Sequence, residues 1–202
     1  MSLISRAIVP VGLLASSLFA PSFAEGIYAK AGGGFTNFSD VTASVGGYSG
    51  ELEIDSGFSY GVGLGYDFGN DFRAELGFNQ ANGELEKIAG VAATADVEVS
   101  TLSVSIFKDF SNDSSFTPYV GVGVGTTNID MDTITVNSNQ YVGADDDATS
   151  LSLTLGSSFE IGDTASAFVE GTYTNIEDLN ITGVEYSDIS TLGANVGVKF
   201  AF

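Results

Sequence analysis

Apolar and polar side chains alternate along much of the chain, and this period of two constrains the fold more than any other feature of the sequence. In the segment 51–68 the even positions, which begin with Leu52 and Ile54, are almost all apolar, whereas the odd positions are small or charged. Segments 116–130 and 148–162 repeat the pattern. Successive side chains of a strand point to opposite faces, so each segment is predicted to be a strand with one apolar and one polar face. The chain is therefore predicted to be all-β, with Leu52 and Ile54 on the same apolar face as the rest of their strand.

Eight strand-like segments can be placed, joined alternately by short and long connections. The short turns, at 69–71, 111–115 and 162–164, are rich in residues that accept turn geometry. This alternation predicts an eight-stranded antiparallel up-and-down β-barrel with both ends of the mature chain on the short-turn side. The chain has no cysteine, so a disulfide framework is excluded. The predicted strands are 26–38, 51–68, 72–86, 97–110, 116–130, 148–162, 165–177 and 188–202, and the long polar connections lie near 39–50, 87–96, 131–147 and 178–187.

The aromatic side chains indicate where the apolar face of the barrel points. A soluble sandwich or barrel turns its large apolar side chains inward. Here parity places one set of aromatic residues on the apolar face beside the short turns and a sparser set toward the long connections, as in the two aromatic girdles of a membrane barrel. The sequence thus predicts a transmembrane barrel with short periplasmic turns and longer extracellular loops, and a soluble periplasmic barrel is the alternative. The first set is Tyr66, Phe68, Phe72, Phe110, Phe116, Phe159, Phe200 and Phe202, and the second is Phe58, Tyr60, Phe78 and Tyr173.

The amino-terminal segment has the features of an export signal. Arg6 precedes an apolar stretch that ends in the small-x-small site Ser22-Phe23-Ala24. We therefore expect residues 1–24 to be a cleaved signal peptide and 25–202 to be the barrel domain. A membrane anchor is disfavoured, because the run is shorter than the roughly 20 apolar residues that span a bilayer and Pro10 interrupts it.

The chain ends on an aromatic strand. Asn195, Gly197, Phe200 and Phe202 have a spacing that resembles the terminal signal by which bacterial outer-membrane barrels are handed to the barrel-assembly machinery. Together with the export signal, this strand predicts the bacterial outer membrane as the location. The expected surroundings are outer-membrane lipid and lipopolysaccharide, and the expected partner is the assembly machinery.

Five short stretches carry a family resemblance. They are 26–28 (GIY), 61–66 (GVGLGY), 117–125 (TPYVGVGVG), 167–170 (AFVE) and 197–200 (GVKF). In this order they resemble the small outer-membrane barrels grouped as opacity-type surface antigens and the transmembrane domain of outer membrane protein A. The resemblance covers essentially the whole mature chain and implies an eight-stranded barrel in the outer membrane. Members of this group are variously structural, adhesive or antigenic, so the resemblance implies a structural or surface-interaction role and nothing narrower.

Charged residues on the polar face are predicted to lie inside the barrel. Parity places three basic and five acidic side chains there, and an unpaired charge in a low-dielectric interior is unfavourable. We expect these groups to pair across strands and fill the lumen; the alternative is a small passive, porin-like channel for ions or small solutes. Inward glycines, such as those at 65, 121 and 197, are expected to leave space for water. The predicted lumen charge network is Lys30, Asp67, Arg73, Glu75, Asp109, Glu160, Glu170 and Lys199.

The predicted extracellular end is strongly acidic. Of the 26 acidic residues, 17 lie in or beside the four long connections, and Lys87 is the one basic residue there. A negative field of this kind argues against nucleic acid as a partner. Carboxylates at 145–147, or at Asp130 and Asp132, suggest divalent cations as a partner, although the spacing matches no calcium-loop motif.

Enzymatic activity is disfavoured by what the chain lacks. It contains no histidine and no cysteine. The usual general base and the usual zinc ligands are therefore missing. Small outer-membrane barrels that are enzymes resemble one another in depending on a histidine beside a serine or aspartate. We expect no enzymatic activity and no cofactor.

Overall fold

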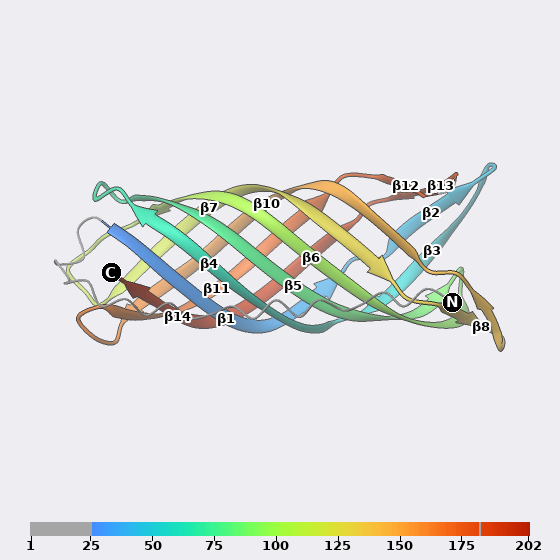
Figure 1. Ribbon diagram of the computed structural model, residues 1–202, viewed down its shortest axis with the longest axis horizontal. Helices are drawn as coiled ribbons and strands as arrows, with labels where there is room; N and C mark the ends of the chain where they lie inside the picture. Colours follow the sequence, from blue (N-terminus) through green and yellow to red (C-terminus); the bar gives the residue numbers. More distant parts are fainter. Residues whose placement is uncertain (1–25, 182) are drawn as a thin grey trace, which may run out of the picture.

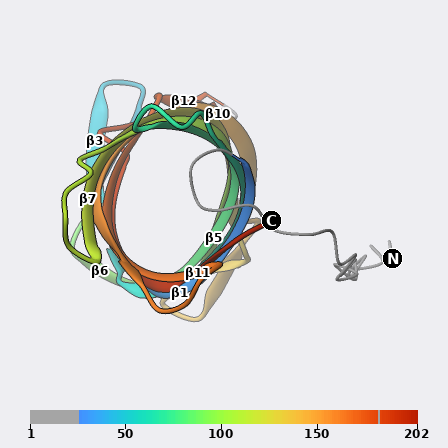
Figure 2. The ribbon, with the colours of Figure 1, turned by 90° about the vertical axis from the view of Figure 1, so that its left-hand side faces the viewer.

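The computed structural model describes residues 26–181 and 183–202, and the predicted signal peptide at 1–24 lies outside this range. Eight long strands form a continuous antiparallel wall (Figure 1). Each pairs with the next along the chain, and β14 pairs with β1, so the sheet closes into the up-and-down ring seen in Figure 2. No helix in the described part of the chain is long and apolar enough to cross a membrane. The wall strands are β1 (Gly26–Phe38), β4 (Gly57–Asp67), β5 (Phe72–Ile88), β6 (Val91–Asp109), β7 (Phe116–Met131), β10 (Ala144–Glu160), β11 (Ala165–Ile176) and β14 (Ser190–Ala201).

Six shorter strands lie at the end of the barrel opposite the short turns (Figure 1). They are β2 (Val41–Val45), β3 (Tyr48–Asp55), β8 (Ile134–Val136), β9 (Asn139–Tyr141), β12 (Leu179–Ile181) and β13 (Val184–Ser187). Most of the segments expected to be long polar connections therefore contain strands. The strand expected at 51–68 is wrong as a single element, because it is interrupted at Ser56 between β3 and β4.

The long connection expected at 87–96 is also wrong. Strands β5 and β6 continue to Ile88 and from Val91, so that only Ala89 and Gly90 form the turn. Both turn residues have positive φ, 50° and 77°, as a two-residue hairpin turn requires. Ala93 and Ala95 of this segment are buried, as expected of a strand with one inward face and not of a polar loop.

Along a single strand, the apolar residues lie on the outer face near the short turns and on the inner face at the other end. On β5 the even residues as far as Glu84 point outward: Phe72 and Phe78 are apolar, but Glu84 is charged. The inward residues change in the opposite sense, from Arg73 near the short turn to the fully buried Leu85. The belt half comprises the segments with an apolar outer face: 27–35 of β1, 58–66 of β4, 72–78 of β5, 102–109 of β6, 116–124 of β7, 151–159 of β10, 167–173 of β11 and 192–200 of β14. The extension comprises the remaining ends of these strands together with the six short strands.

The hydrophobic core of the protein lies inside the extension. It is built from buried aliphatic side chains and one phenylalanine on eight strands and the loop before β14. Leu52 was expected on the outer apolar face but points inward with 4% of its surface exposed, because the interruption at Ser56 shifts the strand phase by one residue. Where water replaces lipid outside, large apolar side chains are buried inside. The core residues are Phe38, Val41, Leu52, Ala81, Leu85, Ala93, Ala95, Val97, Val99, Ala148, Ile176, Leu179 and Ile189.

Candidate functional site: the barrel interior

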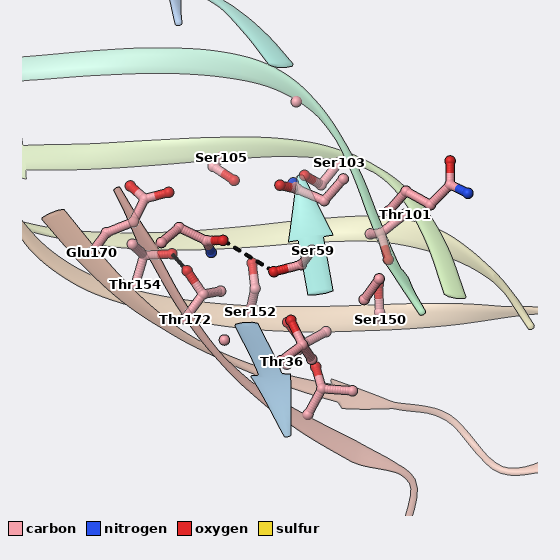
Figure 3. A pocket seen from close by; sticks show the side chains of 18 of the residues that line it. Thr36, Ser59, Thr101, Ser103, Ser105, Ser150, Ser152, Thr154, Glu170 and Thr172 are labelled. Atoms are coloured by element: carbon pink, nitrogen blue, oxygen red, sulfur yellow. Dashed lines mark hydrogen bonds between the residues drawn. The ribbon is translucent and has the colours of Figure 1, made fainter. Parts of the chain in front are cut away.

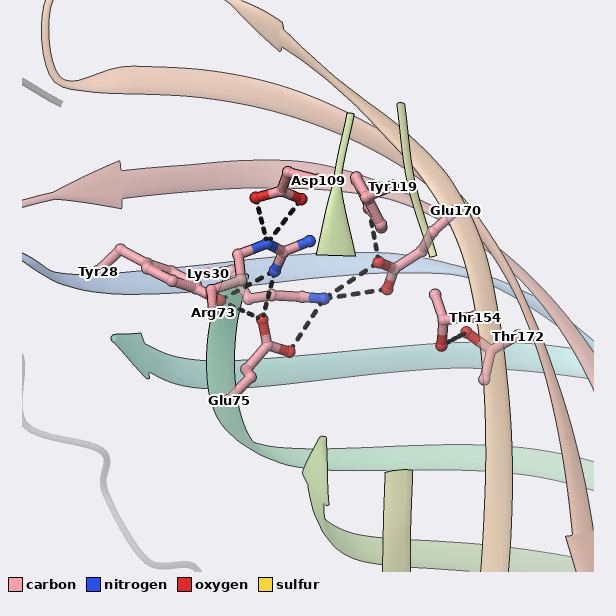
Figure 4. A network of polar contacts seen from close by, with 9 residues as sticks. All are labelled: Tyr28, Lys30, Arg73, Glu75, Asp109, Tyr119, Thr154, Glu170 and Thr172. Carbon is pink, nitrogen blue, oxygen red and sulfur yellow. Dashed lines mark hydrogen bonds and ion pairs between the residues drawn. The ribbon is translucent and has the colours of Figure 1, made fainter. Parts of the chain in front are cut away.

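The inward side chains of the belt half include a dense group of charges (Figure 4). Arg73 is almost completely buried, and its guanidinium lies between two carboxylates. Its Nε donates to both oxygens of Asp109 at 3.1 and 3.2 Å, and its Nη1 lies 3.4 Å from Oε2 of Glu75. The same Nη1 donates to the hydroxyl of Tyr28 at 2.9 Å, and that hydroxyl donates to Glu75 at 3.0 Å. Arg73 is thus held by ligands from β1, β5 and β6.

Lys30 links this group to the opposite wall. Its ammonium lies 3.2 Å from Oε1 of Glu75 on β5 and 3.1 Å from each carboxylate oxygen of Glu170 on β11. The hydroxyl of Tyr119 on β7 donates to Glu170 at 2.9 Å. Charges from four strands are therefore bridged across the lumen, as buried charges require. We call Lys30, Arg73, Glu75, Asp109 and Glu170, with the aromatic rings that pack on them, the plug.

Four inward aromatic rings complete the plug. The Arg73 guanidinium lies 4.0 Å from the ring centre of Phe107 and 4.6 Å from that of Tyr119, and the Lys30 ammonium lies 4.8 Å from that of Phe168. The ring of Tyr28, within 5.2 Å of the Lys199 ammonium, is the fourth. Cations over aromatic faces are stabilised, particularly where water is excluded.

Each of these rings lies directly opposite a glycine on the neighbouring strand. The cross-strand pairs are Tyr28 with Gly65, Phe107 with Gly121, Tyr119 with Gly156 and Phe168 with Gly197. A Cβ atom at any of the four glycines would lie between 2.1 and 2.5 Å from a ring atom. The expectation that inward glycines at 65, 121 and 197 leave space for water is therefore wrong. These glycines provide the space for the rings that obstruct the lumen.

A polar cavity lies between the plug and the core of the extension (Figure 3). It encloses about 880 Å³ of space, part of it open to solvent, and its walls are mainly Ser and Thr hydroxyls. Some of these hydroxyls are hydrogen-bonded: Thr154 lies 3.1 Å from Thr172, and Ser150 accepts a bond at 2.9 Å from Thr127 in the wall behind it. Beyond this cavity the inward side chains become apolar. From the short-turn end toward the extension, the interior therefore consists of three layers: the charged plug, the hydroxyl cavity and the apolar core.

Five of the eight charges predicted to form the lumen network lie in the plug; Asp67, Glu160 and Lys199 do not. These three line an open pocket at the short-turn end. Within the described residues, none of the three has an ion-pair partner within 4.0 Å. Lys199 lies in the same pocket as the carboxylates of Asp67 and Glu160, so the eight predicted charges sum to three positive and five negative. The aromatic rings of the plug were missed by the sequence reasoning, although their inward parity was a usable signal.

The outer surface of the belt half carries the predicted aromatic residues. All twelve are exposed, and the eight near the short turns range from 39% to 60%. The lipid-facing position of these rings agrees with the predicted girdles.

Sequence comparison identifies the family. The outer membrane protein beta-barrel domain family matches residues 7–202. The chain belongs to this family. It is an outer-membrane β-barrel protein, located in the bacterial outer membrane, and its surroundings are lipid and lipopolysaccharide. No relative is found among curated proteins.

Solved structures show the same barrel fold. Neisserial surface protein A is 18% identical with a TM-score of 0.60, and the match covers 88% of this chain and 97% of that one. OprG from Pseudomonas aeruginosa has the same identity and coverages and a TM-score of 0.58. The outer membrane protease OmpT from Escherichia coli is 9% identical with a TM-score of 0.50, covering 91% and 99%. At these identities the likeness shows the fold alone, and the named roles differ among the three proteins.

The predicted assembly residues lie on both faces of β14. Phe200 and Phe202 are exposed on the outer face of the barrel, within the ring near the short turns. Asn195 faces inward and accepts a hydrogen bond from Ser59 at 3.1 Å. Gly197 also faces inward, where a Cβ atom would lie 2.2 Å from the backbone oxygen of Ala31. Glycine at 197 is therefore required by strand and ring packing.

The acidic residues proposed as cation ligands do not converge. Asp130 and Asp145 are directly paired across β7 and β10, and both are exposed. Within the described residues, no group of three or more carboxylates is arranged to hold a metal ion. The acidic residues in and beside the long connections, which we call the acidic rim of the extension, form a diffuse negative surface.

Proposed function

We propose that this protein is a structural or surface-interaction barrel of the outer membrane. The eight wall strands form the transmembrane ring, with short periplasmic turns and longer extracellular loops. The observation that carries this proposal is the plug, whose ion pairs join β1 to β5 and β11 across the lumen and β5 to β6. An eight-stranded barrel is about wide enough for side chains to fill it. The acidic extension is then the part that meets the medium and other cells.

A small passive channel is the second candidate. The hydroxyl cavity favours it, because such a lining suits water and small polar solutes. The plug on one side of this cavity and the apolar core on the other oppose it. An ion crossing the lumen would have to displace a bidentate Arg73–Asp109 contact and then pass aliphatic side chains.

Conductance of the purified barrel in planar lipid bilayers distinguishes the two candidates. We expect no stable unitary current steps from the wild-type protein. If steps are observed and their size changes in Glu75→Gln, while Glu84→Gln on the outer surface leaves it unchanged, the protein is a channel and the proposal is wrong.

The acidic rim suggests how the surface interacts with its surroundings. We infer that divalent cations associate with it diffusely, through the summed field, and that nucleic acid does not bind. Lipopolysaccharide phosphates would then meet the rim only through such cations. Isothermal titration of calcium into the barrel in nanodiscs should show no saturable site; a saturating isotherm would contradict the inference.

Delivery to the membrane is part of the proposal. We infer that the barrel-assembly machinery recognises β14 through Phe200 and Phe202, which face outward. Removing both side chains in Phe200→Ala/Phe202→Ala should lower the amount of heat-modifiable protein in the outer membrane. The matched control is Phe110→Ala/Phe116→Ala, which removes two rings of the same girdle. Equal losses in both variants would mean that lipid contact, not recognition, explains the effect.

No catalytic role is included. The described interior offers carboxylates, one arginine and two lysines as ionisable groups besides tyrosines, and each carboxylate of the plug is already paired. Since a protease shares this fold, the fold itself says nothing on this point.

A further inference from the structure

The core of the extension is not completely filled. A cavity of about 620 Å³, part of it open to solvent, lies among its side chains. The lining is aliphatic and aromatic apart from Ser39, Ser190 and Thr191. A lining of this kind suits an apolar group. An apolar guest in this cavity would be stabilised by van der Waals contacts with the aliphatic side chains that line it.

A second, acidic pocket adjoins this cavity on the outside of the wall. The two share Phe38, Ser39 and Ile54. The acidic pocket is further lined by Asn37 and by four carboxylates. Those carboxylates are Asp40, Glu53, Asp55 and Glu86.

The strand pairing changes at the point where the two pockets adjoin. The ladder between β1 and β4 ends at the pair Thr36 and Gly57, and β3 then pairs with β2 instead of β1. Figure 1 shows the β2–β3 hairpin projecting beyond the ring at this end. A bulge in β5 leaves Glu86 without a cross-strand partner in the ladder with β3. Bulges of this kind commonly aim side chains at binding sites.

The charge of the acidic pocket is mostly uncompensated. Lys87 forms an ion pair with Glu53, but Asp40, Asp55 and Glu86 have no ion-pair partner within the described residues. The hydrogen bond that Lys87 donates to Glu53, with the nearby charges of Glu53, Glu86 and Asp40, raises the pKa of Lys87 above its usual range, as expected in a negative field. The pocket therefore favours a positive group and disfavours an anion.

We infer that the extension binds an amphiphilic cation, with its apolar tail in the core cavity and its positively charged head in the acidic pocket. The tail meets Val41, Val99 and Ile129, and the head meets Asp40, Asp55 and Glu86. This inference goes beyond the proposed function, because it holds whether or not the barrel conducts. Neutral apolar molecules lack the head contact, and fatty-acid anions are repelled by the carboxylates.

The absence of tryptophan in the chain makes the test direct. A single Tyr186→Trp substitution places a fluorescent reporter in the cavity wall, and Met131→Trp supplies a second reporter there. The probe is a dodecyltrimethylammonium with a terminal bromine, which quenches tryptophan on contact. Protein in nanodiscs of zwitterionic lipid keeps the whole barrel folded. Phe78→Trp, on the lipid-facing surface, reports unspecific partition of the probe into the bilayer.

We expect saturable quenching of the cavity reporters at probe concentrations that leave Trp at position 78 almost unquenched. Neutralising the pocket in Asp40→Asn/Asp55→Asn/Glu86→Gln should weaken binding roughly fivefold to tenfold, as three exposed charge contacts predict. The control Asp130→Asn/Asp145→Asn/Asp147→Asn removes the same charge elsewhere on the rim and should change the affinity much less. Val41→Phe, which fills the cavity but keeps the carboxylates, should abolish the quenching.

Three results would overturn the inference. The first is equal quenching by the bromine-tipped dodecyl sulfate, which would show that charge plays no part. The second is quenching that rises in parallel at position 78, which would show partition into lipid only. The third is an equal loss in the two triple variants, which would show an effect of total charge without a local site.

Discussion

The belt half and the extension are continuous pieces of the same strands, yet they are built on opposite principles. On β6, the outward residues of the belt half are Leu102, Val104 and Ile106, whereas those of the extension include Asp96 and Glu98. The inward residues show the reverse, with Ser103 and Ser105 in the belt half and Val97 and Val99 in the extension. The boundary lies within two residues on each face of this strand. The medium outside, lipid or water, determines which face is apolar, while the strand geometry is unchanged.

The two halves are also stabilised differently. In the belt half lipid provides the apolar environment outside, so the interior is free to hold charges, which must then pair. In the extension the interior itself has to provide the apolar environment. The same type of substitution should therefore destabilise the protein much more in one half than in the other. The predictions below test this contrast.

The largest effect is expected from removing a cation of the plug. Arg73→Met removes the ion-pair partner of Asp109 and leaves Glu75 with Lys30 alone, which should destabilise the barrel by about 3–5 kcal/mol. The matched control is Lys87→Met, because Lys87 is an exposed cation of the extension that pairs with Glu53. Its removal should cause little change in stability. Urea unfolding in phospholipid vesicles measures both, and equal effects would mean that the plug is not a structural element.

A somewhat smaller effect is expected from truncating the extension core. Leu85→Ala removes a side chain with no exposed surface, which should lower the free energy of unfolding by about 2–5 kcal/mol. Leu76→Ala, on the same strand but facing lipid, should be milder because lipid chains close over the smaller residue. If the Leu76 variant were the less stable of the two, the extension would have no independent core.

Introducing a charge on the outer face should locate the boundary between the halves. Val104→Arg places a cation in the middle of the apolar belt, at an expected destabilisation of about 2–4 kcal/mol. Ser100→Arg places the same side chain on the same face of β6, only four residues away but in the extension. It should be tolerated. Similar costs at both sites would show that lipid covers more of the wall than the outward chemistry indicates.

The sequence predicted the belt half better than the extension, for a physical reason. Parity places a side chain on one face only while the strand is continuous, and this held for Phe72, Leu76 and Phe78. It failed at Leu52, because the interruption at Ser56 shifts the phase and no residue type marks it. The hairpin turn at Ala89 was missed because the acidic residues on both sides of it, Glu84, Glu86 and Asp96, were interpreted as marking a loop, although strands in water are polar on their outer face.

For the candidate site, the sequence predicted which charged residues face the lumen but not which of them pair. Parity correctly places Lys30, Glu75 and Glu170 inward, but which charges meet depends on strand tilt and register, which the sequence does not specify. For the same reason the pairing of rings with glycines could not be anticipated. Register across β6 and β7 brings Phe107 opposite Gly121, and a shift of one residue would turn the ring toward lipid.

Substituting a glycine that lies opposite a ring tests this pairing, and the expected loss of stability is of intermediate size. In Gly65→Ala the new Cβ atom would lie 2.1 Å from the ring of Tyr28, so the ring and its hydrogen bonds must move. Overpacking of this kind typically costs about 1–3 kcal/mol. Gly77→Ala is the control, since it also faces the lumen but its Cβ atom would have no neighbour closer than 3.6 Å. If both variants unfold like the wild type, the rings do not need the glycines.

The smallest effect is expected at the short-turn end, where Asp71 accepts hydrogen bonds from Lys108 at 2.9 Å and from Ser111 at 2.7 Å. These two bonds, that from Lys108 first, lower the pKa of Asp71 below its usual range. A carboxyl group with a lowered pKa stabilises the folded state above its unfolded-state pKa of about 4, and this contribution is lost as the pH falls through the lower folded value. Asp71→Asn should therefore be slightly less stable than the wild type at neutral pH, with the difference vanishing in acid. Asparagine also tolerates the positive φ of 63° at this position, so the comparison isolates the charge. Because the pair is exposed, added salt should reduce the difference, and a difference that persists in high salt would place the interaction in a shielded environment that the exposed turn does not provide.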